Sequence, residues 1–342
     1  MKQGLEGVGL SWQGKGLALT PRLDGPPPSV REAEGGRGRL LQGDNRRALA
    51  DLAADHAERV TLAYLDPPFL TGRSFEAIVK DPAVRAKDRG GPLKAREKKF
   101  AFDDHWSSRG EYLESIGQRL VLIRKLLAPH GSVVVHVDPK TSHYVKVMGD
   151  EIFGEDAFAS EIIWRYRRWP SKTPNFQRVH DVLLRWRKDP DTKPRFNVPY
   201  EPLAASTLAT WGTKKQRAVV EKDGRRARSS PTEEASKGVP MGDVWEIGVI
   251  APVARERTGY PSQKPEALLE RLILALSDEG EIVLDPYAGS GTTLAVAARL
   301  KRTFLGIDQS EVALGIATNR LEAAGIRFGA ADSVIERTAR SA

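Results

Sequence analysis

Short runs of consecutive apolar residues alternate with longer stretches in which apolar residues recur every three or four positions. The short runs are typical of buried strands, and the recurring positions are typical of helices that pack on a sheet. The pattern predicts strands near residues 40–44, 60–65, 132–137, 160–166, 180–186, 281–285 and 303–307. It predicts helices over residues 45–53, 111–127, 141–152, 265–277, 291–300 and 310–323.

The alternation of strands with helices predicts the fold class. It indicates an α/β fold with a Rossmann-like mixed, mostly parallel sheet flanked by helices, in which ligands bind at the carboxyl ends of strands. Two segments lack a sustained pattern. We expect residues 70–105 to be a mobile loop, and we expect the polar, proline-rich and charged residues 189–245 to form a smaller inserted module.

The composition excludes several function classes. Zero cysteines among 342 residues exclude disulfides, cysteine zinc sites and thiol nucleophiles. Methylation of cytosine at carbon 5 by the usual route is excluded with them, because it needs a thiolate. No apolar run approaches the ~20 residues of a membrane span, and the N-terminus does not resemble a signal sequence, so we expect a cytoplasmic protein without a membrane partner.

Positive charge is concentrated in three stretches. Lys and Arg outnumber acids by eight to three in residues 80–100, by eight to one in 164–188 and by seven to two in 213–228. Such stretches predict a polyanion-binding surface, and aromatic residues in two of them favour nucleic acid over solvated arginine-rich loops. The candidate contacts are Lys94, Lys98, Lys99, Arg165, Arg167, Arg168, Lys214, Lys215, Arg225 and Arg226.

A glycine-rich segment follows the apolar run 281–284 and leads into a predicted helix; it reads Asp285-Pro286-Tyr287-Ala288-Gly289-Ser290-Gly291-Thr292-Thr293. Its glycines permit a ligand to approach the backbone closely, and its threonines can cap the helix. Asp308 lies seventeen residues beyond Gly291, at the end of the next predicted strand, where an acid suits ribose hydroxyls. Leu294 stands where the NAD pattern needs a third glycine. The segment therefore predicts a nucleoside cofactor other than NAD, with a tight strand–helix turn as the alternative.

The tetrad Asp66-Pro67-Pro68-Phe69 follows the predicted strand 60–65. An exocyclic amino group on a base is a poor nucleophile, because its lone pair is delocalised into the ring. The Asp66 carboxylate and the Pro67 carbonyl could accept hydrogen bonds from its two N–H groups and shift the nitrogen towards sp³ geometry. Phe69 could stack on a base that has swung out of the nucleic-acid helix. Such a transfer requires neither a covalent intermediate nor a metal. A simple turn is the alternative for the tetrad alone.

With these motifs in this order, the chain resembles the β-group amino-methyltransferases of DNA, which use S-adenosylmethionine and include restriction–modification enzymes and orphan relatives. In that family the catalytic motif precedes the cofactor motif, and here Asp66 precedes Gly289 by 223 residues. The likeness covers about residues 38–325, with Phe69 where tyrosine is commoner and Asp308 where glutamate is frequent. Further matching segments are Gly43-Asp44, 153–164, His180-Asp181, Gly242-Asp243-Val244-Trp245, 260–265 and 304–308.

The resemblance implies a circularly permuted class I methyltransferase. It divides the chain into a flexible arm (1–37), a catalytic half (38–188), a target-recognition insert (189–245) and a cofactor-binding half (246–342). It implies S-adenosylmethionine as cofactor and a catalytic set of Asp66, Pro67, Pro68 and Phe69. The implied cofactor contacts are Asp44, Lys264, Asp285, Pro286, Ala288, Gly289, Ser290, Gly291, Thr292 and Asp308.

The substrate implied by the resemblance is double-stranded DNA, with base flipping. An acid at the first place of the tetrad resembles the tetrads of adenine-N6 enzymes. We therefore expect methylation at N6 of adenine, with N4 of cytosine as the alternative. Two other classes are a methyltransferase of RNA or protein, where asparagine usually replaces Asp66, and an inactive DNA-binding homologue. A homodimer and a cognate restriction endonuclease are compatible partners. We assign His180 a structural role and Trp164 to the pocket wall or core.

Overall fold

The computed structural model describes residues 9–12, 15, 20–80, 96–170, 172, 174–220 and 222–329. The chain forms two compact units, one made of Met1–Phe196 with Asp243–Ala342 and the other of Asn197–Gly242. Among the helices that the structure describes, none is long and apolar enough to cross a membrane.

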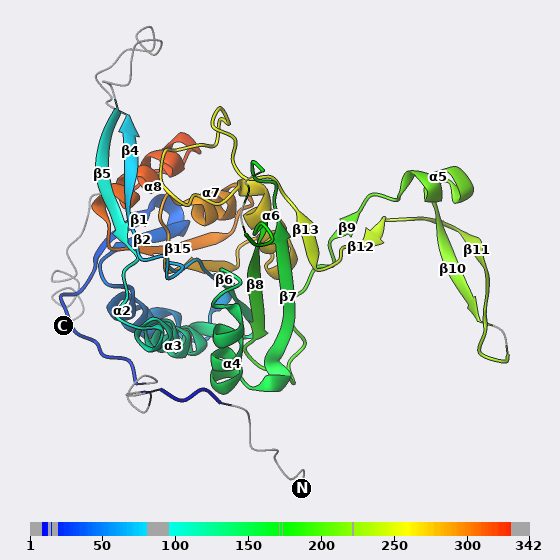
Figure 1. Ribbon diagram of the computed structural model, residues 1–342, viewed down its shortest axis with the longest axis horizontal. Helices are drawn as coiled ribbons and strands as arrows, with labels where there is room; N and C mark the ends of the chain where they lie inside the picture. Colours follow the sequence, from blue (N-terminus) through cyan, green and yellow to red (C-terminus); the bar gives the residue numbers. More distant parts are fainter. Residues whose placement is uncertain are drawn as a thin grey trace, which may run out of the picture. The chain divides into compact units, whose positions relative to one another are not determined.

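The first unit contains one nine-stranded sheet with the order β1-β2-β15-β14-β3-β6-β8-β7-β13 (Figure 1). Only β1 and β8 run antiparallel to their neighbours, so the sheet is mixed and mostly parallel, as predicted. The bounds are β1 Ser29–Ala33, β2 Gly38–Gln42, β3 Val60–Leu65, β6 Leu127–Val137, β7 Phe158–Arg165, β8 His180–Arg187, β13 Val244–Glu246, β14 Ile282–Asp285 and β15 Thr303–Asp308.

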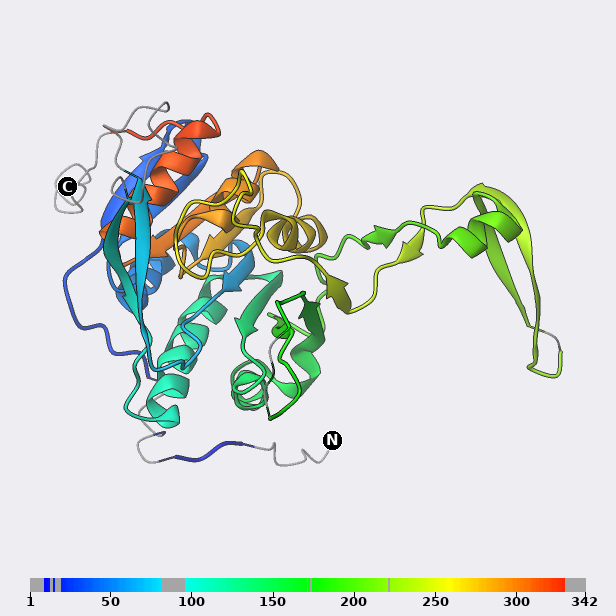
Figure 2. The same cartoon turned by 45° about the horizontal axis from the view of Figure 1, so that its top comes forward.

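Helices cover both faces of this sheet (Figures 1 and 2). The layer on one face consists of α2 (Asn45–His56), α3 (Arg109–Leu126) and α4 (Ser142–Phe153). The layer on the other face consists of α6 (Glu266–Leu276), α7 (Thr292–Arg299) and α8 (Glu311–Ala323). All six residues of β3 are buried, because a central parallel strand has a helix layer on each side. Short 3-10 turns occupy Glu34–Gly36 and Glu155–Ala157.

The expectation of a mobile loop over residues 70–105 is wrong for the part that the structure describes. Strands β4 (Ser74–Lys80) and β5 (Arg96–Asp103) form an antiparallel pair, and the rings of Phe75 and Phe102 stack across it with centroids 4.7 Å apart. Buried Asp104 accepts the backbone N–H groups of Leu70 and Thr71 at 2.9 and 2.8 Å. These contacts join residues about thirty positions apart, which a local hydrophobic pattern does not reveal.

The end of the predicted N-terminal arm is also part of the sheet, because β1 pairs with β2 from Ser29 to Ala33. A flexible arm over the whole of residues 1–37 is therefore not what the structure has.

The second unit consists of paired strands and one short helix. Its elements are β9 (Tyr200–Glu201), α5 (Ala205–Trp211), β10 (Lys214–Val220), β11 (Arg226–Ala235) and β12 (Val239–Pro240), with β10 paired to β11 and β9 to β12. It is shorter than the insert expected over 189–245. Arg195 forms ion pairs with Asp278 and Glu281 of the first unit, and Val244–Glu246 adds strand β13 to the main sheet. The role of the second unit in target recognition stays a prediction.

Candidate active site

The predicted catalytic and cofactor motifs meet at one edge of the sheet. Parallel strands β3, β14 and β15 all end there, so the segments that follow them converge on a cavity of about 310 Å³. The predicted residues that line this cavity are Asp66, Pro67, Pro68, Phe69, Lys264, Asp285, Pro286, Ala288, Gly289, Ser290, Thr292 and Asp308. Asp44 and Gly291 do not line it.

Asp308 fastens the glycine-rich turn to the end of β15. Its carboxylate accepts the backbone N–H of Gly289 and that of Ser310, each at 2.8 Å. Gly289 has φ of 50°, and a Cβ there would lie 3.1 Å from the ring of Tyr260. Burial raises the pKa of Asp308 above its usual range. The backbone thus stays close to the cavity at Gly289, which is the shape that a bound nucleoside requires.

Gly291 packs against a helix. Its φ is 71°, and a Cβ would lie 2.8 Å from that of Ala317 in α8. The expectation that threonines cap α7 is wrong, since Gly291 is the N-cap residue and no side chain caps this helix. The Thr292 hydroxyl instead accepts a hydrogen bond from Arg320 at 2.9 Å. Gly291 is therefore needed for close packing of α8 on the turn.

Asp44 caps a helix as well. Its Oδ1 accepts the N–H groups of Arg46 and Arg47 at 2.9 and 3.4 Å, at the start of α2. Its neighbour Asn45 lines the cavity and donates to the Pro286 carbonyl at 2.8 Å. Asp44 thus caps α2, while Asn45 lies beside the turn. The assignment of Asp44 to the cofactor stays a prediction.

Asp285 is a buried carboxyl in the cavity wall. It accepts the Tyr287 N–H at 2.9 Å and a hydrogen bond from the Thr293 hydroxyl. Burial is the main cause that raises the pKa of Asp285 to about 7, above the usual value of 3.8, even though both hydrogen bonds act in the opposite direction. The folded protein therefore holds a proton here that the unfolded chain releases between about pH 4 and pH 7.

This proton predicts a pH-dependent stability for the cofactor-free protein. The stabilising contribution is full below about pH 4 and is lost as the pH rises to about 7, since a buried carboxylate is then left charged. Asp285→Asn should therefore stabilise the protein more at pH 8 than at pH 5. The difference between the two gains in unfolding free energy should be on the order of a few kcal/mol, and the melting temperature should rise accordingly. Thermal unfolding across this range checks it. If stability depended on pH equally in parent and variant, the raised pKa of Asp285 would be contradicted. Some pH dependence should remain in both proteins, because the pKa of Asp308 is raised as well.

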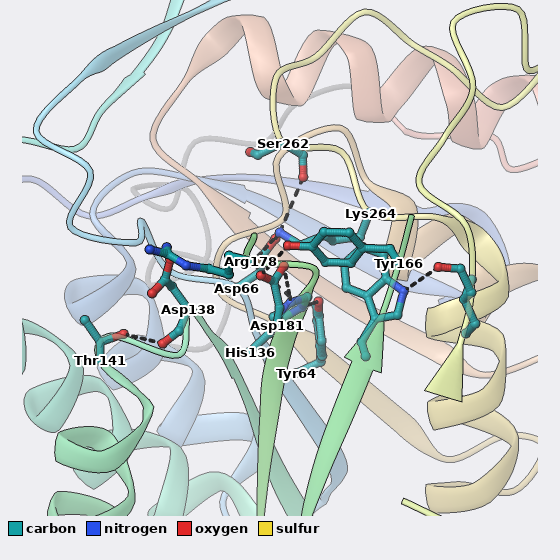
Figure 3. A network of polar contacts seen from close by, with 12 residues as sticks. Tyr64, Asp66, His136, Asp138, Thr141, Tyr166, Arg178, Asp181, Ser262 and Lys264 are labelled. Atoms are coloured by element: carbon teal, nitrogen blue, oxygen red, sulfur yellow. Dashed lines mark hydrogen bonds and ion pairs between the residues drawn. The ribbon is translucent and has the colours of Figure 1, made fainter. Parts of the chain in front are cut away.

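Asp66 forms an ion pair inside the site. The ammonium of Lys264 lies 2.7 and 2.5 Å from its two carboxylate oxygens, and the Lys264 side chain is only 9% exposed (Figure 3). The same ammonium lies 4.9 Å from the centre of the Phe69 ring. Lys264 therefore holds both the carboxylate and the aromatic face of the tetrad, which its assignment as a cofactor contact did not anticipate.

A buried histidine adjoins the tetrad (Figure 3). Fully buried His136 has Nδ1 2.8 Å from the Tyr64 hydroxyl and Nε2 3.3 Å from Oδ2 of Asp181, and its ring centre is 5.7 Å from that of Phe69. Burial and the charge of Lys264 lower the pKa of His136. Because a carboxylate can only accept, Nε2 of the neutral ring donates to Asp181, and Nδ1 accepts from Tyr64.

The sequence prediction missed this network. Its outer members are Asp181, which accepts from the Tyr166 hydroxyl at 2.9 Å, and Arg168, which donates to that hydroxyl at 3.2 Å. The signal for His136 was a histidine among the valines of residues 133–137. Trp164 is buried as expected, and its Nε1 donates to the Ile247 carbonyl at 2.9 Å.

The predicted nucleic-acid contacts are mostly exposed and paired with surface acids. Lys98 pairs with Glu76, Lys99 with Glu97, Arg165 with Glu246, Lys214 with Glu233, Lys215 with Glu234 and Arg225 with Asp223. Exposed pairs of this kind contribute only about 0–1 kcal/mol, so a phosphate can displace the acid. Arg167 is exposed; Lys94 and the side chain of Arg226 lie outside what the structure describes.

Among the described residues, no group of three His, Asp or Glu side chains could hold a metal ion. The donor set of the cavity fits a nucleoside with an amino-acid tail better, since acids, backbone N–H groups, one lysine and aromatic rings line it together.

The chain belongs to the DNA methylase family that modifies N6 or N4 amino groups, whose model matches residues 60–319. It is an S-adenosylmethionine-dependent DNA amino-methyltransferase of the restriction–modification type.

Individual relatives fit this family. The type II methyltransferase M.HpaI of Haemophilus parainfluenzae is 30% identical over 272 residues, which cover 79% of this chain and 74% of that protein. The DNA adenine methyltransferase YhdJ of Escherichia coli (strain K12) is 26% identical over 83% of each chain. The solved structure of the PvuII DNA methyltransferase (cytosine-N4-specific) has a TM-score of 0.52 at 16% identity, covering 83% of this chain and 86% of that one. It shares the fold.

Proposed function

We propose that this protein transfers the methyl group of S-adenosylmethionine to N6 of adenine in double-stranded DNA, with the target base flipped out of the helix. The observation that carries the proposal is the acid at the start of the tetrad, Asp66, which lines the same cavity as the glycine-rich turn and Asp308. An acid in this place resembles adenine enzymes, whereas serine is frequent in cytosine enzymes. The name of the relative YhdJ, a DNA adenine methyltransferase, supports the same choice.

The catalytic work assigned to the tetrad is to expose the amine lone pair. When bound, S-adenosylmethionine would supply an electrophilic methyl group on a sulfonium; the methyl–sulfur bond would break as the methyl–nitrogen bond forms, leaving a neutral thioether, and the nitrogen would release a proton to solvent. The Asp66 carboxylate and the Pro67 carbonyl accept hydrogen bonds from the two N–H groups of the amine. The carboxylate oxygens have enough lone pairs to do so while they also accept from Lys264. The positive charge that develops on the nitrogen is stabilised by Asp66 until a proton leaves. Phe69 stacks on the flipped base and aligns it.

We assign the remaining cavity residues to the cofactor. Asp308 takes the ribose hydroxyls and keeps Gly289 in position, while Asp285 and the turn enclose the methionine part. Lys264 lines the same cavity, and we assign it to the cofactor while its ammonium stays paired with Asp66. Since the relative M.HpaI is a type II methyltransferase, we also propose a cognate restriction endonuclease as a partner in the cell.

The base is identified by expressing the protein in a host without DNA methyltransferases of its own. Its DNA is digested to nucleosides and analysed by mass spectrometry beside DNA from the empty host. We expect N6-methyldeoxyadenosine. N4-methyldeoxycytidine would overturn the choice of base and leave amino methylation intact, and no methylated deoxynucleoside would overturn the function.

Binding to duplex DNA should fall steeply with salt, because phosphate contacts release counterions, with a log–log slope of about −0.9 per phosphate neutralised. If the second unit touches the backbone, that slope should become shallower by roughly one to three when four of its cations are changed to glutamine. These are Lys214, Lys215, Arg225 and Arg226. Fluorescence anisotropy between about 50 and 200 mM salt measures the slope.

A charge-matched control changes four cations of the first unit to glutamine. They lie at the amino ends of the parallel strands, at the edge of the main sheet opposite the active site, and are Arg59, Lys125, Arg299 and Lys301. This control should keep the parent slope. A flat salt response in the parent protein would contradict DNA as the substrate, and equal slopes for the two quadruple variants would remove the second unit from the DNA contact.

A further inference from the structure

Two large aromatic side chains project into solvent from the connection between β7 and β8. Trp169 is 92% exposed and Phe176 is 100% exposed, more than any other aromatic side chain named among the exposed residues of the described chain. Burying such rings is favourable, so leaving both in water suggests a surface that a partner covers. We call Trp169 and Phe176 the aromatic pair.

This connection begins at the edge of the sheet where the catalytic tetrad lies. Strand β7 runs in the same direction as β3 and β6, because both β6 and β7 are antiparallel to β8, which lies between them. Its carboxyl end at Arg165 therefore shares an edge with the end of β3, which Asp66 follows. The aromatic pair is thus attached beside the site where a flipped base would enter.

Both ends of the connection are tied to the site (Figure 3). Tyr166 donates its hydroxyl to Asp181 at 2.9 Å, and its N–H bonds the Val179 carbonyl at 2.9 Å. The guanidinium of Arg178 lies 2.5 Å from Oδ2 of Asp138, directly after β6. These hydrogen bonds and the ion pair fix the two ends of the connection relative to His136 and the tetrad.

The backbone that carries the aromatic pair is also held. The amide of Gln177 donates to the Trp169 carbonyl at 2.7 Å, which links the two arms of the connection just below the rings. The Phe176 N–H bonds the side chain of Asn175 at 2.7 Å. The rings themselves remain exposed, so the main chain is positioned while the aromatic faces are available.

The charges around the aromatic pair identify its partner. The connection and its ends contain the cations Arg165, Arg167, Arg168, Lys172 and Arg178. Arg165 pairs with Glu246 and Arg178 with Asp138, so the excess of positive charge comes from Arg167, Arg168 and Lys172. Cations suit phosphates and exposed aromatic rings suit the faces of bases, a combination typical of nucleic-acid surfaces. An apolar protein partner would not need this excess of positive charge.

We propose that Trp169 and Phe176 act as a wedge that enters the duplex beside the target base and stacks on the bases that the flipped nucleotide leaves uncovered. The inference rests on the proposed function, because only a flipped base leaves such a gap. An extrahelical base loses its own stacking and pairing, and apolar side chains inserted between base steps compensate for this loss in other proteins that distort DNA. The wedge therefore stabilises the open duplex and does not take part in the chemistry.

The test compares two duplexes that differ only opposite the target adenine. One is fully paired, and the other has an abasic position there, so that flipping costs less. Methylation by Trp169→Ala/Phe176→Ala should lose about 10- to 100-fold in kcat/KM on the paired duplex, the scale of one or two lost stacking contacts. On the abasic duplex the loss should be less than about threefold, because flipping no longer breaks a base pair and the open state depends less on the wedge. Trp169→Phe should keep most of the activity on both duplexes.

The matched control is Leu274→Ala, an apolar residue 44% exposed near the end of α6, at the opposite edge of the sheet. It should leave both rates unchanged. Because the aromatic pair is exposed, melting temperatures should match the parent. A 2-aminopurine at the target position gives a second reading without chemistry: its fluorescence on saturating binding should rise with the parent protein and rise less with the double variant.

Equal losses on the two duplexes, or no loss on either, would overturn the wedge while the parent's methylation upholds the proposed function. A parent protein that methylates DNA without any rise in 2-aminopurine fluorescence would overturn base flipping and the wedge with it. A parent that methylates neither duplex would overturn the proposed function and, because the wedge rests on that function, the wedge with it.

Discussion

Asp66→Ala protein is expected to lose methyl transfer by ~10²–10³-fold or more, while it still binds S-adenosylmethionine. The carboxylate is assigned to the amine of the target base and to the charge that develops there, so its removal acts on the transition state. Methylation rates on duplex DNA, with cofactor affinity measured by calorimetry, check this. A variant that methylates at the parent rate would show that the catalytic assignment is wrong.

The ion pair with Lys264 requires a control for folding. In Asp66→Ala the buried ammonium of Lys264 loses the carboxylate that lies 2.5 Å from it, and an unpaired buried charge is destabilising. Asp66→Ala/Lys264→Met removes both charges and should recover thermal stability without recovering activity. Asp66→Asn keeps one acceptor and should retain part of the rate. Recovery of activity in the double variant would mean that Lys264, when unpaired, was the inhibitory group.

Asp308→Ala should weaken binding of S-adenosylmethionine by roughly 1.5–3 kcal/mol, the scale of a hydrogen bond to a charged group. We assign Asp308 to the ribose, and the structure adds a second task, because its carboxylate accepts the N–H of Gly289. Both tasks act on cofactor binding, and neither acts on the target base. Titration calorimetry with the cofactor measures the loss.

The matched control for Asp308 is Ser310→Ala. Ser310 caps α8 through the Ala313 N–H at 3.3 Å and does not line the cavity, so its loss destabilises the same corner without removing a ligand contact. It should lower the melting temperature and leave cofactor affinity unchanged. Equal losses of affinity in both variants would mean that Asp308 acts only through the local fold.

The central sheet could be predicted because its strands are short apolar runs with few alternatives. Val60–Leu65 is buried on both faces, and a run of that kind fits only an internal strand once helices flank it. The convergence of Asp66 with Gly289 and Asp308 followed from the same prediction, because carboxyl ends of parallel strands share one edge. Neither inference needed a long-range contact to be known.

The features that sequence patterns missed depend on partners far along the chain. Strand β5 is rich in charged residues, and it is held to β4 by antiparallel pairing and by the Phe75–Phe102 stack. The partner of His136 is Asp181, 45 residues away, so nothing local marks them as a pair. Asp44 was assigned to the cofactor, and the structure shows that it also caps α2 by accepting free N–H groups.

The most direct test of the account follows a labelled methyl group. Purified parent protein and Asp66→Ala are incubated with duplex DNA and S-adenosylmethionine that carries a deuterated methyl group, and the DNA is then digested and analysed by mass spectrometry. We expect deuterated N6-methyldeoxyadenosine with the parent protein and a yield at least ~10²-fold lower with Asp66→Ala. Label that enters DNA equally with both proteins, or that enters no DNA base with the parent, would contradict it.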